Sequence, residues 1–280
     1  MKSIWAHVLV KNEERYLWYA VTSVIDFVDR VLLWDTGSSD NSLQIIREIQ
    51  KNYPSKVDFK ETGEVTPERY TEIRQEMLES SKSDWFLLVD GDEVWWKDSI
   101  KKVTKVIQEK GDSMESLVVK MIYPIGDIFH YQEEAAGNYL IDGERGHIAV
   151  RAVNCKIPGL HYEKPHGKQG IYDAKGVLIQ NRDATKRLHL DASYLHFSHL
   201  PRSGNRMGDL LVPKRKMKLK YEVGYPFPKD YFYPEVFFRP RPSIAPSIWG
   251  RMDNKFLLRA ALATPFRKAK RRIFKRKVGY

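Results

Sequence analysis

Two hydrophobic periods alternate over the first 125 or so residues, and this alternation restricts the fold more than any other feature. Stretches with apolar residues at every second position are followed by stretches with helical spacing. Such alternation is typical of strand–helix units that build a parallel sheet, so we expect an α/β fold with a Rossmann-like, mostly parallel central sheet. The expected strands are residues 4–10, 31–34, 57–59 and 85–89. The expected helices are residues 14–27, a segment through Ile45, Ile46 and Ile49 capped by Ser39 or Asp40, and residues 67–80, capped by Thr66 and opened by Pro67.

The sequence beyond residue 126 has a different pattern. Short strand-like segments alternate with loops rich in glycine, histidine and proline, which predicts an irregular second lobe. Residues 226–246 contain six prolines among aromatic residues, so we expect an extended, ordered connector there.

Positive charge is concentrated near the C-terminal end. Eight lysines and arginines between positions 267 and 277 supply most of the net charge of +11, so the rest of the chain is close to neutral. The single cysteine, Cys155, cannot form an internal disulfide, and no window approaches the roughly 20 apolar residues of a spanning helix. The N-terminal residues run directly into a strand-like segment without a signal-like apolar stretch. We therefore expect a cytoplasmic protein.

Three expected strands end in polar and acidic residues. Lys11-Asn12-Glu13-Glu14 follows the first strand, residues 35–40 follow the second, and Asp90-Gly91-Asp92-Glu93 follows the apolar run at 85–89. Ligands of open α/β sheets bind outside the carboxyl ends of the strands, and two carboxylates separated by glycine can hold a hard divalent cation beside phosphate oxygens. Ordinary turns are the alternative, and a capped turn fits residues 35–40 nearly as well. The recurrence at three strand ends favours one shared site.

The N-terminal half resembles glycosyltransferase family 2, the inverting enzymes of the GT-A fold. The resemblance rests on residues 8–17 as the first strand and turn, residues 35–42 as the nucleoside turn, and Asp90-Gly91-Asp92-Glu93 as the DXD metal motif. It implies a GT-A fold with an irregular acceptor lobe, to which the charge pattern adds a basic helical C-terminal tail. It also implies transfer of a sugar from a nucleotide-sugar donor, with a UDP-sugar favoured over a GDP-sugar, to a hydroxyl of a glycan or lipid-linked acceptor. Mn²⁺ or Mg²⁺ would be the cofactor.

The resemblance also implies a set of binding residues. Asp90 and Asp92 would hold the metal, with His196 slightly favoured over His199 as a ligand from the second lobe; a hydrogen-bonded structural histidine is the alternative. Gln75 stands where the family has the asparagine of an Arg-Asn pair. The implied donor-binding residues are Val10, Asn12, Glu13, Glu14, Asp35, Arg74, Asp90 and Gly91.

An inverting transfer needs a base that accepts the proton of the acceptor hydroxyl. Residues 151–154 followed by 159–163 are similar to an Arg-Phe-Arg-Asn…His-Glu pattern of one branch of the family, although Val153 replaces the second arginine. This similarity implies Glu163 as the base. Asp142, Glu144 and Asp173 remain alternatives.

These features suggest four segments: a donor-binding half at 1–125, an acceptor and catalytic half at 126–225, a connector at 226–255 and a basic amphipathic tail at 256–280. Apolar residues interrupt the charges of the tail at near-helical spacing, which suits a helix on the anionic inner face of a membrane, so we expect peripheral association there. A solvated basic end is the alternative. The interrupting residues are Phe266, Ala269, Ile273, Phe274 and Val278.

Two other functions are alternatives to a glycosyltransferase. A sugar nucleotidyltransferase could use a similar scaffold, but the chain lacks a glycine- and lysine-rich phosphate loop near the first strand. A non-catalytic protein that binds membrane or nucleic acid through its basic end leaves the three acidic strand ends unexplained. We expect no nucleic-acid partner.

Overall fold

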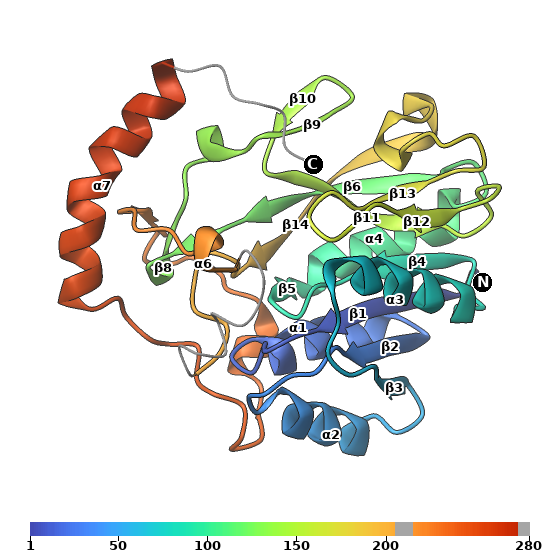
Figure 1. The fold of residues 1–280 in the computed structure, drawn as a ribbon, viewed down its shortest axis with the longest axis horizontal. Coiled ribbons are helices and arrows are strands. Elements are labelled where there is room, and N and C mark those ends of the chain that lie inside the picture. Colours follow the sequence, from blue (N-terminus) through green and yellow to red (C-terminus); the bar gives the residue numbers. More distant parts are fainter. Residues whose placement is uncertain (205–214, 274–280) are drawn as a thin grey trace.

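The computed structural model describes residues 1–204 and 215–273, and its centre is an eight-stranded sheet (Figure 1). The strand order is β3-β2-β1-β4-β11-β6-β14-β5. The bounds are β1 Ile4–Val10, β2 Arg30–Asp35, β3 Val57–Glu61, β4 Trp85–Leu88, β5 Glu93–Trp95, β6 Ser116–Ile122, β11 Ile148–Asn154 and β14 Arg187–His196.

Most neighbouring strands of this sheet are parallel. β3, β2, β1 and β4 run in parallel, and β14 is parallel to β6. β11 is antiparallel to both β4 and β6, and β5 is antiparallel to β14. The expected α/β fold is therefore confirmed. Because β11 and β14 come from beyond residue 126, the second part of the sequence also contributes to the central sheet.

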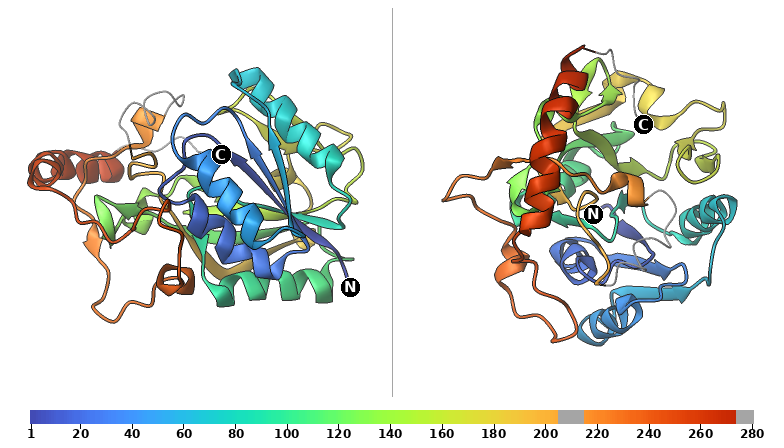
Figure 2. Two further views of the ribbon diagram at one scale, coloured as in Figure 1. Left: turned by 90° about the horizontal axis from the view of Figure 1, so that it is seen from below. Right: turned by 60° about the vertical axis from the view of Figure 1, so that its left-hand side comes forward.

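Helices cover both faces of the sheet. Val8 and Val10 of β1 join an apolar cluster with residues of α1, α2 and α4, whereas Leu9 packs with Ile73 and Met77 of α3. Successive side chains of a strand point to opposite faces, so α3 and α4 lie on opposite sides of the sheet (Figure 2). The helices are α1 Leu17–Val24, α2 Ser42–Asn52, α3 Pro67–Ser80 and α4 Lys97–Lys110.

Local sequence signals located several of these elements. The strand expected at 4–10 is β1, and the helix expected at 67–80 is α3, with Pro67 in its first turn. The hydroxyl of Thr66 accepts a hydrogen bond from the N–H of Arg69, as expected of a cap. α2 begins at Ser42 and its N-cap is Asn41, so neither Ser39 nor Asp40 occupies the expected cap position, although the N–H of Ser42 donates to Asp40 at 3.0 Å. The helix expected at 14–27 is shorter at both ends, because residues 14–16 form a turn and a 3-10 helix replaces the last three residues.

The remaining strands form small sheets beside the central one, which agrees with the irregular second lobe. β9 (Tyr139–Ile141) pairs with β10 (Glu144–Gly146), and β12 (His161–Glu163) pairs with β13 (Gly170–Tyr172). A third sheet has the order β15 (Tyr225–Pro226), β8 (Asp127–Tyr131), β7 (Pro124–Ile125). Elements not expected from the sequence include α4, β5 and β6.

The C-terminal part consists of an irregular segment and one long helix. Residues 226–246 contain a short 3-10 helix, Glu235–Phe238, and the main-chain oxygen of Phe232 accepts a hydrogen bond from Trp96 at 2.8 Å. Helix α7, Asn254–Ile273, runs along the edge of the molecule. No helix in the described part of the chain is long and apolar enough to cross a membrane. The tail residues Phe274, Lys275, Arg276, Lys277 and Val278 lie outside the described residues.

We expect Thr66→Ala to lower the free energy of unfolding by about 1 kcal/mol, because α3 would lose the side chain that satisfies the N–H of Arg69. Urea denaturation measures this difference. Thr104→Ala is the matched control: Thr104 lies inside α4 and its hydroxyl caps no helix start, so alanine should not destabilise the protein. Equal stability of the Thr66 variant and the wild type would contradict the capping role.

Candidate active site

Side chains tie together the turns that follow β1 and β2. Asn12, with φ 52°, accepts a hydrogen bond from the N–H of Ser39 at 2.7 Å, and its own N–H donates to Ser38 Oγ at 2.8 Å. The carbonyl of Val10 accepts from the N–H of Thr36 at 2.9 Å and from its hydroxyl at 2.8 Å. Because β1 and β2 are parallel neighbours, both turns lie at the same edge of the sheet.

The carboxylate of Asp35 is buried inside its own turn. Oδ1 accepts hydrogen bonds from the N–H groups of Gly37 and Ser38 at 2.9 and 2.8 Å, and Oδ2 accepts from the Ser38 hydroxyl at 2.5 Å. Burial raises the pKa of Asp35, and the bonds from Ser38 and Gly37 partly offset that rise. The structure thus shows the capped turn that was the alternative interpretation, and a direct contact with the donor stays a prediction.

Glu14 and Gly91 allow the turns after β1, β2 and β4 to lie close together. The carboxylate of Glu14 accepts hydrogen bonds from the N–H of Asn41, at 2.9 Å, and from the N–H of Gly204. A Cβ atom at position 91 would lie 2.9 Å from Cγ of Glu13. Only glycine therefore lets the Glu13 side chain reach this edge of the sheet.

The acidic turn after β4 is held by two arginines. Arg151 of β11 forms an ion pair with the buried Glu93 and lies 3.7 Å from Asp90, and Arg74 of α3 donates to Asp90 at 3.0 Å. The Asp90 side chain is 37% exposed, whereas Asp92 is buried. Burial opposes ionisation of Asp90, but Arg151 and Arg74 outweigh it and hold its pKa below the usual value. Asp90 is therefore a carboxylate at neutral pH.

Two further arginines close the opposite side of the site. Nη1 of Arg202 lies 2.8 Å from Asp92 Oδ2 and 3.1 Å from Glu13 Oε1. Arg215, in the short helix α6 (Arg215–Lys218), lies 2.5 Å from Glu13 and donates to the carbonyl of Lys11 at 2.7 Å. Sequence reasoning missed both arginines. The position of residue 202 just after β14 was the available signal, because β14 ends at the same edge of the sheet as β4.

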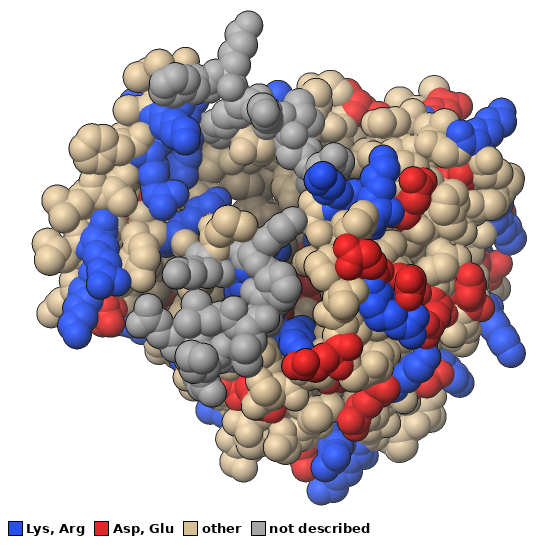
Figure 3. Space-filling view, in the orientation of Figure 1, with Lys and Arg blue, Asp and Glu red and all other residues tan. Residues whose placement is uncertain are grey.

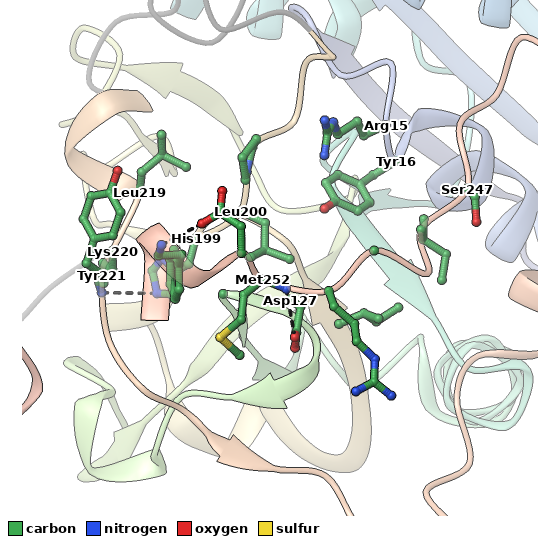
Figure 4. Close-up of a pocket in the computed structure, with 18 residues that line it drawn as sticks. Arg15, Tyr16, Asp127, His199, Leu200, Leu219, Lys220, Tyr221, Ser247 and Met252 are labelled. Carbon is green, nitrogen blue, oxygen red and sulfur yellow. Dashed lines mark hydrogen bonds between the residues drawn. The ribbon is translucent and has the colours of Figure 1, made fainter. Parts of the chain in front are cut away.

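The two candidate histidines face different parts of the molecule. His196 lies 3.6 Å from Asp92 Oδ2 and 3.6 Å from Glu93 Oε1. Burial lowers the pKa of His196 to about 4, so its ring is neutral at pH 7 and can ligate a metal. His199 instead lines a separate cavity of about 330 Å³ (Figure 4), and its Nε2 lies 3.2 Å from Lys220 Nζ. The structure thus brings His196, and not His199, to the acidic turn.

The residues at the acidic turn fit a divalent cation. Asp90, Glu93 and His196 each offer a ligand atom, and these atoms lie within 4.8 Å of one another. Among the described residues, Asp92 Oδ1 and His196 Nδ1 are buried without a hydrogen-bond partner, a cost that a bound cation would offset. Carboxylate and imidazole ligands suit Mg²⁺ or Mn²⁺. Glu93 joins the three ligand candidates that the sequence suggested.

Two cavities meet at the acidic turn. The larger, of about 310 Å³, is bounded by β9, β11 and the β12–β13 hairpin. The smaller, of about 100 Å³, is bounded by the ends of β1 and β4 and by the loop after β14. Residues that line both are Tyr70, Asp90, His166, His196 and Lys218. This arrangement offers space for two ligands on either side of one carboxylate cluster.

The four candidate bases lie away from this cluster. The Glu163 side chain is 52% exposed on β12 and lines neither cavity. Asp142 and Glu144 lie beside His189, at 2.9 and 3.1 Å. Asp173 accepts hydrogen bonds from N–H groups of its own turn. The structure therefore does not bring these acids to Asp90.

The sequence profile described as glycosyl transferase family 2 matches residues 6–160, which is more than half of the chain. The chain belongs to glycosyl transferase family 2. Family membership confirms the resemblance seen in the sequence and, with it, the expected class of enzyme, a glycosyltransferase. No curated protein has a significant sequence match to the chain.

Several solved structures are similar to this chain, and the TarS structure, at a TM-score of 0.50, shares its fold. S. aureus TarS in complex with UDP-GlcNAc has 17% identity and a TM-score of 0.50, over 75% of this chain and 62% of that chain. Mannosyltransferase PcManGT from Pyrobaculum calidifontis, with GDP-Man and Mn²⁺, has 14% identity and a TM-score of 0.46, over 72% and 58%. Glucosyl-3-phosphoglycerate synthase from Mycobacterium tuberculosis, with Mn²⁺, UDP and phosphoglyceric acid, has 15% and 0.45, over 75% and 74%. The chain spans 36% to 62% of the TarS chains it matches.

We expect Arg151→Gln to lower the free energy of unfolding by about 3 kcal/mol, because Glu93 would lose the cation that neutralises it in the interior. Glu93→Gln in the same chain should recover part of this loss, since no buried charge would then lack a partner. Urea denaturation of the wild type, both single variants and the double variant measures the coupling. Arg145→Gln, on the exposed surface of β10, is the control and should change little. Additive losses in the double variant would contradict the pairing.

Proposed function

We propose that the chain is an inverting, metal-assisted glycosyltransferase that moves a sugar from a nucleoside-diphosphate sugar to a hydroxyl of a glycan or lipid-linked acceptor. The observation that carries this proposal is the meeting of Asp90, Asp92 and His196 at the carboxyl edge of the sheet, with a cavity on either side. We place the reaction in the cytoplasm, because the single cysteine, Cys155, is free.

Asp90, Asp92 and His196 would hold Mn²⁺ or Mg²⁺, with Glu93 as a further candidate ligand. When bound, such a cation supplies Lewis-acid stabilisation of the negative charge on the departing nucleoside diphosphate. The protein holds two of these side chains in the protonation states that a metal ligand needs. Arg151 holds Asp90 ionised, and burial holds the His196 ring neutral.

The smaller cavity is the proposed site of the donor diphosphate. Lys11, Arg202, Arg215 and Lys218 place four cationic side chains on its wall, and charge-assisted hydrogen bonds from such groups bind phosphate oxygens strongly. The turns after β1 and β2 lie beside this cavity and would seat the nucleoside. A UDP-sugar is our first choice of donor and a GDP-sugar the second; the TarS structure that shares this fold contains UDP-GlcNAc.

The larger cavity is the proposed site of the acceptor. Tyr139, Tyr162 and Gln169 on its wall offer aromatic faces and polar groups, which together suit a sugar ring. The base must lie within hydrogen-bond reach of the attacking hydroxyl. For Glu163 to serve, the β12–β13 hairpin that carries it would have to bring its side chain into this cavity. The mechanism therefore leaves the identity of the base open among Glu163, Asp142, Glu144 and Asp173.

We expect Asp92→Asn to abolish metal-dependent release of nucleoside diphosphate from the donor and to weaken Mn²⁺ binding more than about tenfold, because a neutral amide is a poor ligand for a hard cation. The fold should persist, since the amide oxygen can still accept from Arg202. Calorimetry with Mn²⁺ and a product assay with and without chelator measure both effects. Asp98→Asn, an exposed acid on α4, is the control. Turnover that chelator does not affect would refute metal assistance.

Lys218→Gln should weaken binding of UDP about tenfold, because it removes a cation from the wall of the smaller cavity, and bonds to charged groups contribute about 1.5–3 kcal/mol. Its side chain is exposed, so stability should not change. Calorimetric titration with UDP in the presence of Mn²⁺ gives the affinity. Lys229→Gln, an exposed lysine in the connector, is the matched control. Equal affinity in the Lys218 variant would place the diphosphate elsewhere.

A further inference from the structure

Helix α7 is attached to the body of the protein by one face only. Ala260 and Thr264 on that face are buried, and the Thr264 hydroxyl accepts a hydrogen bond from the N–H of Val223 at 2.8 Å. Arg271 forms ion pairs with Glu222 and, at 2.8 Å, with Glu133. These contacts fix the rotation of α7 about its own axis, so its opposite face must point away from the body.

The opposite face of α7 carries an apolar stripe, which we define as Leu258, Leu262, Phe266 and Ile273. Their exposed fractions are 67%, 67%, 78% and 73%. At 3.6 residues per turn the four positions fall within an arc of about 80°, roughly opposite the buried face. Single exposed apolar residues are common, but four on one face of a helix mark an interaction surface. Within the described residues no other segment covers this row, and α7 lies at the edge of the molecule (Figures 1 and 2).

Basic residues flank the apolar stripe on both sides. Helical geometry places Arg259 and Lys270 along one border and Arg272 along the other, with Lys268 between Arg272 and the attached face. None of these four forms an ion pair within the described part of the chain, and α7 contains no acidic residue. Lysine and arginine side chains are visible along this edge of the surface in Figure 3. Arg259 and Lys268 contact Tyr221 and Tyr225, but no acidic side chain among the described residues compensates the charge of these four cations.

We propose that the apolar stripe of α7 docks the protein on an anionic membrane surface. An apolar row between two rows of cations matches the boundary between acyl chains and anionic headgroups, where apolar side chains insert and each Lys or Arg contributes about 1 kcal/mol of attraction. Charge complementarity selects this partner over a second copy of the chain, because two such faces would repel one another. The docking does not depend on sugar transfer. It fixes which side of the molecule faces the lipid.

Co-sedimentation of the full chain with vesicles tests this inference without any nucleotide sugar. Phe266→Glu and the double variant Leu262→Glu/Phe266→Glu are compared with the wild type on vesicles of phosphatidylcholine alone and with phosphatidylserine added. Phe232→Glu is the matched control, because Phe232 is similarly exposed but lies outside α7. Equal urea midpoints of all variants would show that the changes act on the surface and not on the fold.

We expect binding of the wild type and of the Phe232 variant to anionic vesicles, weakened by salt, and a loss of more than about tenfold in both α7 variants. Equal binding of the α7 variants and the wild type would overturn the inference. Equal binding to neutral and anionic vesicles would contradict the claim that the membrane must be anionic. A concentration-dependent dimer that the α7 variants lose, without vesicle binding by the wild type, would overturn it in favour of self-association.

Discussion

The ion pair between Arg151 and Glu93 is the interaction on which the site depends. β11 enters the sheet antiparallel between β4 and β6, and this insertion places Arg151 beside the turn that follows β4. The same guanidinium bonds Tyr194 of β14 at 2.7 Å, so one side chain joins three strands. A buried carboxylate is tolerated only with a partner of opposite charge, and Arg151 supplies it. The acidic turn could not stay in the interior without the second part of the chain.

The other buried acids of the site are also paired with arginines from the second part of the chain. Glu13 and Asp92 are buried and face Arg202 and Arg215, which come from the segment after β14. These arginines balance negative charge in the described structure, and they stand where a donor diphosphate would need cations. Because these arginines neutralise Glu13 and Asp92, the remaining carboxylate is Asp90. Asp90 is partly exposed and lines both cavities, so it can contact both proposed substrates. The acidic turn, His196 and the arginines therefore form one electrostatic unit.

Local patterns predicted the parts of this unit that are contiguous in sequence. β1 and α3 could be located to the residue, because alternation, the Thr66 cap and Pro67 are local signals. The acidic turn was recognisable because it follows a fully apolar run. The contacts of Arg202 and Arg215 join residues more than one hundred positions apart, which periodicity cannot reveal. The same limit applies to Glu163: the sequence could match a motif, but the pairing of β12 with β13, which exposes its side chain, depends on the tertiary fold.

The central claim is that a divalent cation binds at the acidic turn together with the nucleotide-sugar donor. Anomalous diffraction from crystals grown with Mn²⁺ and UDP tests it most directly, because it locates the metal without reference to activity. The account predicts one strong manganese peak in contact with Asp90 or Asp92 and with His196, and density for the diphosphate beside Arg202 and Lys218. A manganese peak elsewhere, or diphosphate density distant from these residues, would contradict it.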